Sequence, residues 1–192
     1  MKKEDIGWLA GIIDGEGNFT IRCRVTHSKI LNKDRLRFWI ELTIVNTDIN
    51  VINKLEKILT NLNIKYRRYY RDRKIPNSKR LHMITLSTKR LQKLIPFIEK
   101  EVSKQKEIKI IKNALNIISN RKKAYISNEN LKKLNDYRKA LLEIHGNQAK
   151  KLARNLVKKE YLLTEEDLQK LKNFYKERCY KMLAGKKLKK IT

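Results

Sequence analysis

From residue 9 to residue 17 the chain reads Leu9-Ala10-Gly11-Ile12-Ile13-Asp14-Gly15-Glu16-Gly17, so two acids lie among glycines at the end of an apolar run. Together with Gly7, the glycines at 11 and 15 are spaced four apart and share one face of a helix. Because that face carries no side chains, another backbone can approach it closely, as at small-residue helix crossings in membranes. The sequence therefore predicts a helix that packs tightly on another helix and ends at Asp14 and Glu16.

This stretch resembles the motif of the LAGLIDADG homing endonucleases, with Glu16 in the place of the second acid. The resemblance implies that two such helices pack side by side, with Gly7, Gly11 and Gly15 at the interface. It also implies that the last acid of each motif binds a divalent metal, so Glu16 is the expected ligand and Gly15 is expected at the same site. Asp14 is then expected to make structural hydrogen bonds. The alternatives are that Glu16 is an ordinary solvated acid and that Asp14 is a second metal ligand.

The charge of the chain predicts a polyanionic partner. Lys and Arg number 47 against 20 Asp and Glu, which gives a formal net charge of +27. Self-repulsion on that scale is typical of proteins that bind nucleic acid, and the charge alone fits DNA and RNA equally. No basic amphipathic helix stands apart from the rest of the chain, and no apolar run approaches the roughly 20 residues that span a bilayer, so no membrane partner is expected.

The cysteines favour an intracellular protein. Cys23 and Cys179 form no CxxC pair and have no nearby pair of histidines, which disfavours a zinc site and a disulfide framework. The N-terminus carries acids and leads directly into the motif, so no signal peptide is expected. We expect the cytoplasm of an archaeon or bacterium, or an organelle that encodes the protein.

After Gly17 the apolar residues alternate with polar ones, which predicts strands. Phe19, Ile21, Cys23 and Val25 are expected to point inward on the first strand. Residues 27–34 read as a polar loop, after which Leu36 to Ile44 alternate in the same way. Two such runs joined by a loop predict an antiparallel hairpin.

The rest of the first 120 residues completes the order of a known fold. Asn46-Thr47-Asp48 offers caps for a helix, residues 64–73 are rich in Tyr and Arg, a turn surrounds Pro76, and a strand is expected at 81–86. Thr88 is expected to cap a short helix that Pro96 interrupts, and a longer helix starts at Ser103. The order αββαββα, with the motif in the first helix, is that of the LAGLIDADG fold, an α+β fold with a curved antiparallel saddle. Residues 1–120 are the predicted endonuclease core.

Residues 121–192 are predicted to form a basic helical extension. Leu131, Leu134, Tyr137 and Leu141 make one apolar stripe, and Thr164 followed by three acids is a good helix start. The extension either buttresses the core or touches flanking nucleic acid. The lysine-rich end from Lys186 to Lys190 is expected to add non-specific phosphate attraction.

The chain carries one copy of the motif. Leu183-Ala184-Gly185 imitates its beginning, but lysines follow in place of acids and glycines. In the resembled family, single-motif members act as homodimers. A homodimer pairs the first helix with its own copy about a two-fold axis and predicts a roughly palindromic DNA site.

Two further residues are catalytic candidates through the resemblance. Lys104 follows the helix that contains Pro96, where the family places a basic residue near the reactive phosphate; the alternative is an ordinary surface lysine. Asp48 follows the second strand, where related enzymes carry a polar residue that organises water. Its alternative, compatible with the first, is a helix cap.

The outward side chains of the strands form the predicted DNA-binding surface. An ordinary solvated face would mix Glu with Lys, whereas this one is rich in Arg, which forms paired hydrogen bonds to guanine edges in the major groove. Arg67, Tyr69 and Arg71 fall on the other alternation and are left out, and His27, His82 and His145 form no cluster. The predicted set is Asn18, Thr20, Arg22, Arg24, Arg35, Arg37, Trp39, Glu41, Tyr66, Arg68, Tyr70, Arg80 and His82.

The sequence thus predicts an intron-encoded, homodimeric endonuclease that cuts double-stranded DNA with a divalent metal. Mg²⁺ is expected, with Mn²⁺ or Ca²⁺ able to occupy the site, because carboxylates suit hard cations. One alternative is an RNA-binding intron maturase, which the same cationic surface suits. Another is a non-cleaving DNA-binding protein, against which the retained Glu16 argues.

Overall fold

The computed structural model describes residues 2–72, 79–119, 126–146 and 157–174. The elements are α1 (Lys3–Glu16), β1 (Gly17–Ser28), β2 (Lys33–Asn46), α2 (Ile49–Asn61), β3 (Arg67–Arg71), β4 (Leu81–Ser87), α3 (Thr88–Ile98), α4 (Gln105–Ser119), α5 (Asn128–Ile144) and the 3₁₀ turn η1 (Lys159–Tyr161). Residues 165–174 form a further helix. The predicted αββαββα order of an α+β fold is confirmed.

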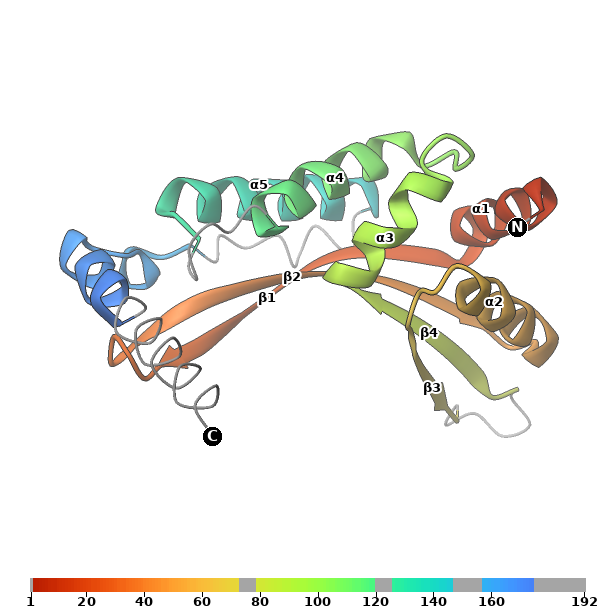
Figure 1. Ribbon diagram of the computed structural model, residues 1–192, viewed down its shortest axis with the longest axis horizontal. Coiled ribbons are helices and arrows are strands. Elements are labelled where there is room, and N and C mark those ends of the chain that lie inside the picture. The colour runs from red at the N-terminus through yellow and green to blue at the C-terminus, as the bar shows by residue number, and fades with distance from the viewer. Residues whose placement is uncertain (1, 73–78, 120–125, 147–156, 175–192) are drawn as a thin grey trace, which may run out of the picture.

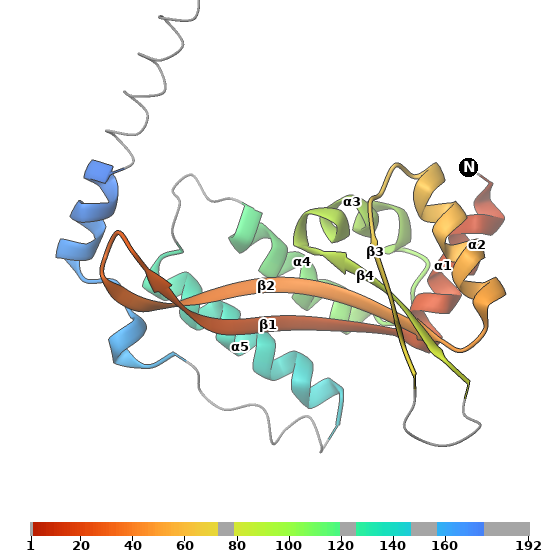
Figure 2. The same ribbon diagram turned by 90° about the horizontal axis from the view of Figure 1, so that it is seen from below.

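The four strands form one antiparallel sheet in the order β1-β2-β4-β3. Figure 1 shows α3, α4 and α5 on one side of the arched strands, and Figure 2, seen from below, shows the strands in front of these helices. The sheet therefore has one face covered by helices and one open face. We call the second the open face.

The core lies between the sheet and the helices, as the alternation predicts. Phe19 on β1 pairs with Leu42 on β2, which in turn pairs with Leu86 on β4, and all three side chains are fully buried. Leu9 and Ile13 of α1 join the same core. Burying one such side chain is worth about 1.5–3 kcal/mol, so the register that places these residues on one face is strongly favoured.

The predicted loop at residues 27–34 is wrong, because β1 and β2 continue through most of it to a turn at 29–32. Val25 was expected to point into the core but is 45% exposed. Its partner Leu36 is buried. The difference follows from position, since β1 is the edge strand whereas η1 lies against β2.

The helix at 88–98 also differs from its prediction. Pro96 lies inside α3 without interrupting it. The carbonyl that loses its hydrogen bond belongs to Gln92, which is exposed and therefore accessible to water. Ser87, rather than Thr88, occupies the cap position, and the Thr88 hydroxyl instead accepts a hydrogen bond from the Ile40 N–H at 2.9 Å.

The C-terminal region packs on the core through α5. Leu131, Leu134 and Leu141 of α5 are buried in the main core, and α5 lies against α4 and β1.

The boundary between the endonuclease core and the helical extension at residue 120 stays a prediction. The turn around Pro76, Cys179 and the lysines at 186–190 lie outside the described residues. Within the described ranges, every helix is too short or too polar to cross a membrane.

Candidate active site and nucleic-acid interface

The junction of α1 and β1 fixes Glu16 in place. Glu16 is the last residue of α1 and is exposed, and Gly17 begins β1 directly after it. The Gly17 N–H donates to the Ile13 carbonyl, and a Cβ at Gly17 would lie 2.5 Å from that oxygen. Only glycine therefore fits this close approach, and the sharp passage from helix to strand presents Glu16 at the surface.

Asp14 ties the α3–α4 loop to the motif. Its carboxylate accepts hydrogen bonds from the backbone N–H groups of Ser103 at 2.7 Å and Lys104 at 3.3 Å. The structural hydrogen-bonding role predicted for Asp14 is confirmed, and both of its carboxylate oxygens are engaged. The loop that carries Lys104 is thereby fixed to the end of α1.

Lys104 reaches the same junction. Its Nζ donates to the carbonyl of Gly17 at 2.6 Å and to that of Ile13 at 3.1 Å. Glu16 lies between these two residues in the chain, so a cation is held on the backbone of the turn that carries Glu16. The structure places Lys104 at the motif, and its role at a phosphate stays a prediction.

Glu16 has the chemistry of a metal ligand but cannot form a complete site alone. It is exposed and forms no ion pair with any described residue. Among the residues described, no three of His, Cys, Asp and Glu come together in a way that would hold a metal. One carboxylate and the free carbonyls at a helix end are hard oxygen donors that fit a divalent cation, provided that a second carboxylate comes from elsewhere.

None of the residues that the structure describes covers the glycine face of α1. Gly7, Gly11 and Gly15 are exposed, and a Cβ at any of them would meet no atom within 4 Å. This face lies next to Glu16 along the helix. It is therefore available to a partner, while the opposite side of α1 is buried through Leu9 and Ile13.

Asp48 is the N-cap of α2. Its Oδ1 accepts a hydrogen bond from the Asn50 N–H at 2.8 Å, and its own N–H donates to the Asn46 side chain at 2.7 Å. The helix-cap interpretation is confirmed. A role in organising water, which is compatible with the cap, stays a prediction.

The register places most of the predicted DNA-binding side chains on the open face. Asn18, Thr20, Arg22 and Arg24 pair with Thr43, Glu41, Trp39 and Arg37, and Thr26 pairs with Arg35. Arg22 forms an ion pair with Glu41, and the Arg24 guanidinium lies 5.7 Å from the centre of the Trp39 ring. These contacts hold the side chains of Arg22 and Arg24 on the open face, where both residues stay exposed to solvent.

The facing predicted for β3 is wrong, and His82 on β4, a strand with apolar residues on both alternations, does not lie on the open face. Arg68 pairs with the buried Ile84, so it faces the helix side, where its guanidinium forms an ion pair with Glu56 of α2 at 2.8 Å. Tyr70 and its partner His82 share that side. The open face instead receives Arg67, Tyr69 and Arg71.

The cause is the absence of a hydrophobic signal in β3, because all five of its residues are exposed. The burial of Ile84 and Leu86 on β4 would have fixed the facing. Tyr66 precedes β3 and packs partly against the core. Arg80 also leaves the predicted surface, since it pairs with Asp72 at 2.7 Å and lies over the Tyr70 ring.

Cys23 is not poised for chemistry. It is a half-buried free thiol on β1. Burial raises the pKa of the Cys23 thiol to about 11, although the charge of Arg138 on α5 lowers it in part. The thiol is therefore protonated near neutral pH and is a poor nucleophile and metal ligand.

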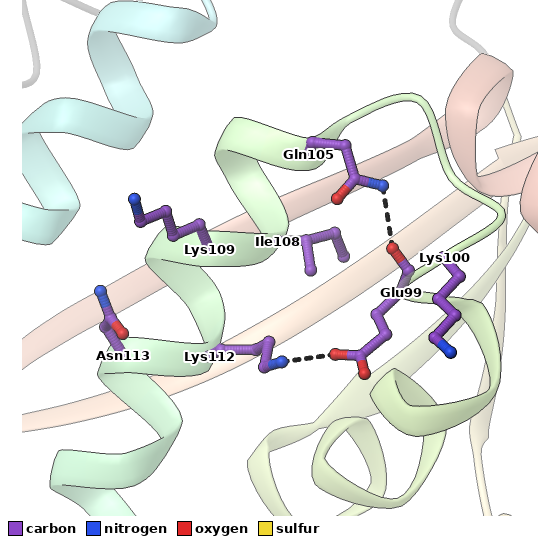
Figure 3. A pocket seen from close by; sticks show the side chains of 7 residues that line it. All are labelled: Glu99, Lys100, Gln105, Ile108, Lys109, Lys112 and Asn113. Atoms are coloured by element: carbon purple, nitrogen blue, oxygen red, sulfur yellow. Dashed lines mark hydrogen bonds and ion pairs between the residues drawn. The ribbon is translucent and has the colours of Figure 1, made fainter.

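A separate groove of about 630 Å³ lies between the end of α3 and α4, as Figure 3 shows. Its only lining acid, Glu99, pairs with Lys112 at 2.5 Å, and the Gln105 amide donates to the Glu99 carbonyl at 2.8 Å. Because the Glu99 carboxylate is already paired, it is not free to bind a metal in this groove. The junction of α1 and β1 is the stronger candidate site.

Comparison with known families shows the family of the chain. A family model described as LAGLIDADG endonuclease matches residues 9–118, from the first residue of the motif to the end of α4. This chain belongs to the LAGLIDADG endonuclease family. No curated protein sequence matches the chain.

Solved LAGLIDADG homing endonucleases share the fold at low sequence identity. I-CvuI, crystallised with its target in the presence of calcium, has a TM-score of 0.54 at 17% identity, over 90% of this chain and 97% of its own. I-LtrWI, bound to target DNA, has a TM-score of 0.56 at 17% identity, over 84% of this chain and 54% of its own. I-GzeII, in complex with a DNA target, has a TM-score of 0.53 at 18% identity, over 69% of this chain and 43% of its own.

Proposed function

We propose that two copies of this chain form a divalent-metal-dependent homing endonuclease that cuts both strands of a long, near-palindromic DNA site. One observation carries the proposal. The junction of α1 and β1 brings Glu16 and Lys104 together, beside an uncovered glycine face and at one end of a cationic sheet face.

The dimer follows from what one chain lacks. Each chain supplies one exposed motif acid and one open glycine face, and a two-fold axis through that face brings two Glu16 carboxylates together. The share of each solved chain that this chain covers supports the same arrangement. This chain spans 97% of I-CvuI but 54% of I-LtrWI, as expected if the second copy of the fold comes from a partner here and from the same chain there.

Glu16, together with the Gly15 carbonyl, is the proposed holder of the metal, and Mg²⁺ is the ion that we expect. The ion would supply Lewis-acid chemistry to the hydrolysis of the phosphodiester bond. Structures of I-CvuI were obtained with calcium and with magnesium, which supports a divalent ion in this fold. Lys104 adds a fixed positive charge beside the site, where it favours the negative charge that develops on the phosphate.

The open face is the proposed DNA surface. Arg22, Arg24 and Arg37 share it with Trp39 and short polar groups, which is the mixture that reads base edges. β1 has 12 residues and is therefore about 40 Å long at about 3.3 Å per residue. That length slightly exceeds one turn of duplex, about 34–36 Å, so each protomer reaches about ten base pairs from the centre.

The test starts from duplexes that the wild-type protein selects from a randomised DNA library. The selected site should be close to palindromic, and both of its strands should be cut with Mg²⁺ and left intact with EDTA. Tight binding to RNA with no selection of DNA would instead favour an RNA partner and refute the proposal. Site-selective DNA binding without cleavage in any divalent metal would show a DNA-binding protein and would refute the proposed cleavage. An intracellular location and an intron-borne gene also stay proposals.

A further inference from the structure

The segment 157–174 returns to the turn of the β1–β2 hairpin. Leu31 in the turn is buried against Leu163 and Leu171, with Ile30 and Leu168 packed around them. Both views show this segment, in blue, beside the end of the hairpin (Figures 1 and 2). It makes a small apolar cluster that is separate from the main core.

A polar network joins the same parts. Lys33, at the start of β2, donates to the Leu162 carbonyl at 3.0 Å and pairs with Asp167. Asp167 is 7% exposed and also accepts from the Thr164 N–H at 2.9 Å, while the Thr164 hydroxyl accepts from the Asp167 N–H at 3.1 Å. Burial alone would raise the pKa of Asp167, but the hydrogen bonds from Lys33 and Thr164 outweigh it and lower the pKa below its usual value. The carboxylate is therefore ionised at neutral pH, and its Oδ2 accepts from both Lys33 and Thr164.

The segment is anchored to the core at its other end. The Leu163 N–H donates to the Asn128 side chain at 2.8 Å, and the Asn128 amide donates back to the Leu163 carbonyl at 2.7 Å. Asn128 is the first residue of α5, which is packed in the main core. The chain of contacts thus runs from α5 through Leu163 and Asp167 to Lys33.

The hairpin needs such support. β4 pairs with β2 only from Glu41 to Asn46, so from Lys33 to Ile40 the one strand beside β2 in the described part of the chain is β1. Leu36, Phe38 and Ile40 still reach the main core, but residues 24–28 and 33–35 contribute nothing to it. A two-stranded ribbon without such packing is marginally stable. This ribbon carries Arg22, Arg24 and Arg37 on the open face, and any mobility in it would have to be lost on binding, at a cost in affinity.

We propose that residues 157–174 act as a clamp that fixes the part of the β1–β2 ribbon nearest its turn, residues 24–37, in the conformation that binds DNA. Asp167, acting through Lys33, is then a positioning residue for base discrimination at the ends of the site. The inference rests on the proposed DNA-binding function. Lys33 follows the same alternation as Arg35 and Arg37, yet its ammonium is held by the clamp. Its contribution to DNA reading is therefore to fix the strand.

The first experiment is amide hydrogen exchange on the full chain without DNA, comparing Asp167→Asn with Glu166→Gln. Glu166 is the neighbouring acid of the same helix turn and pairs only locally, with Lys170 at 2.6 Å, so the control removes the same charge. Asp167→Asn should speed exchange in residues 24–37 about tenfold or more, equivalent to about 1.4 kcal/mol, and leave α1 and α2 unchanged. Unchanged exchange in the ribbon overturns the clamp.

The second experiment selects duplexes from a randomised DNA library with the wild type and with both variants. Asp167→Asn should lose base preference at the outer positions of the site and keep it at the centre, while Glu166→Gln should match the wild type. Should Asp167→Asn fail to fold, Leu171→Ala opens the apolar cluster without a change of charge and should give the same end-restricted loss.

A loss spread evenly over the site, or no loss, overturns the positioning role, because a merely stabilising segment changes affinity uniformly. A wild type that selects no sequence refutes the DNA-binding proposal together with base discrimination. Exchange in the ribbon then still decides whether the clamp exists.

Discussion

Asp14→Asn is expected to destabilise the protein and to displace Lys104. Asp14 accepts two backbone N–H groups, and an asparagine of the same shape has one acceptor oxygen, so the N–H of Ser103 or Lys104 loses its partner. Hydrogen bonds to a charged group are worth about 1.5–3 kcal/mol, and the solvent exposure of Ser103 reduces this to about 1–2 kcal/mol here.

The assay is urea unfolding at a fixed protomer concentration, because a dimer's stability depends on concentration. Asp48→Asn is the matched control, since Asp48 makes one cap hydrogen bond that asparagine replaces equally well. The reasoning fails if both variants lose the same amount, or if Asp14→Asn unfolds at the wild-type midpoint.

Three further predictions follow from the open glycine face, the corrected sheet facing and the buried thiol. Gly11→Leu should give a folded monomer in sedimentation equilibrium, because a Cβ at this position meets no described atom within 4 Å whereas the side chain blocks the proposed partner. Thr60→Leu on α2 should stay dimeric, and a dimeric Gly11→Leu would contradict the interface. Arg67→Ala should change the bases that a selected duplex tolerates, whereas Arg68→Ala should mainly lower stability through the lost pair with Glu56; the reverse result would restore the original facing. In Cys179→Ser protein, Cys23 should carry about a hundredfold less thiolate at pH 7–8 than a thiol of pKa 9.0, since its pKa is about 11, and should therefore react more slowly with iodoacetamide. A rate typical of a free thiol would contradict this.

The sequence predicts well wherever one face of an element is buried. The motif helix, the hairpin alternation over 19–23 and 36–44 and the apolar face of α2 all carry strong periodic signals, and the structure follows them. Thr164 and Asp167 likewise predict the start of the last described helix, where the side chain of each accepts a hydrogen bond from the backbone N–H of the other. In these places local pattern and tertiary packing favour the same structure.

The errors lie where burial gives no signal. β3 is exposed on both faces, so the choice between Arg67 and Arg68 depends on the strand that β3 pairs with, which is a tertiary fact. Residues 27–34 are mostly polar, and polarity alone does not distinguish the far end of a ribbon from a loop. The two apolar exceptions, Ile30 and Leu31, pack against residues far along the chain. The bonds from Asp14 to Ser103 and from Lys33 to Asp167 join residues far apart in the chain, and no local pattern predicts them.

The most direct test of the central claim is cleavage and binding by Glu16→Gln on a DNA site selected by the wild type. The substitution keeps shape and volume but removes the charge that would hold a divalent metal, and Glu16 is exposed at the end of α1, so the fold should be intact. With Mg²⁺, cleavage should fall by several orders of magnitude. In EDTA, binding should persist or tighten slightly, because one carboxylate fewer faces the phosphates. A Glu16→Gln protein that binds the site and cuts it at the wild-type rate would contradict the account.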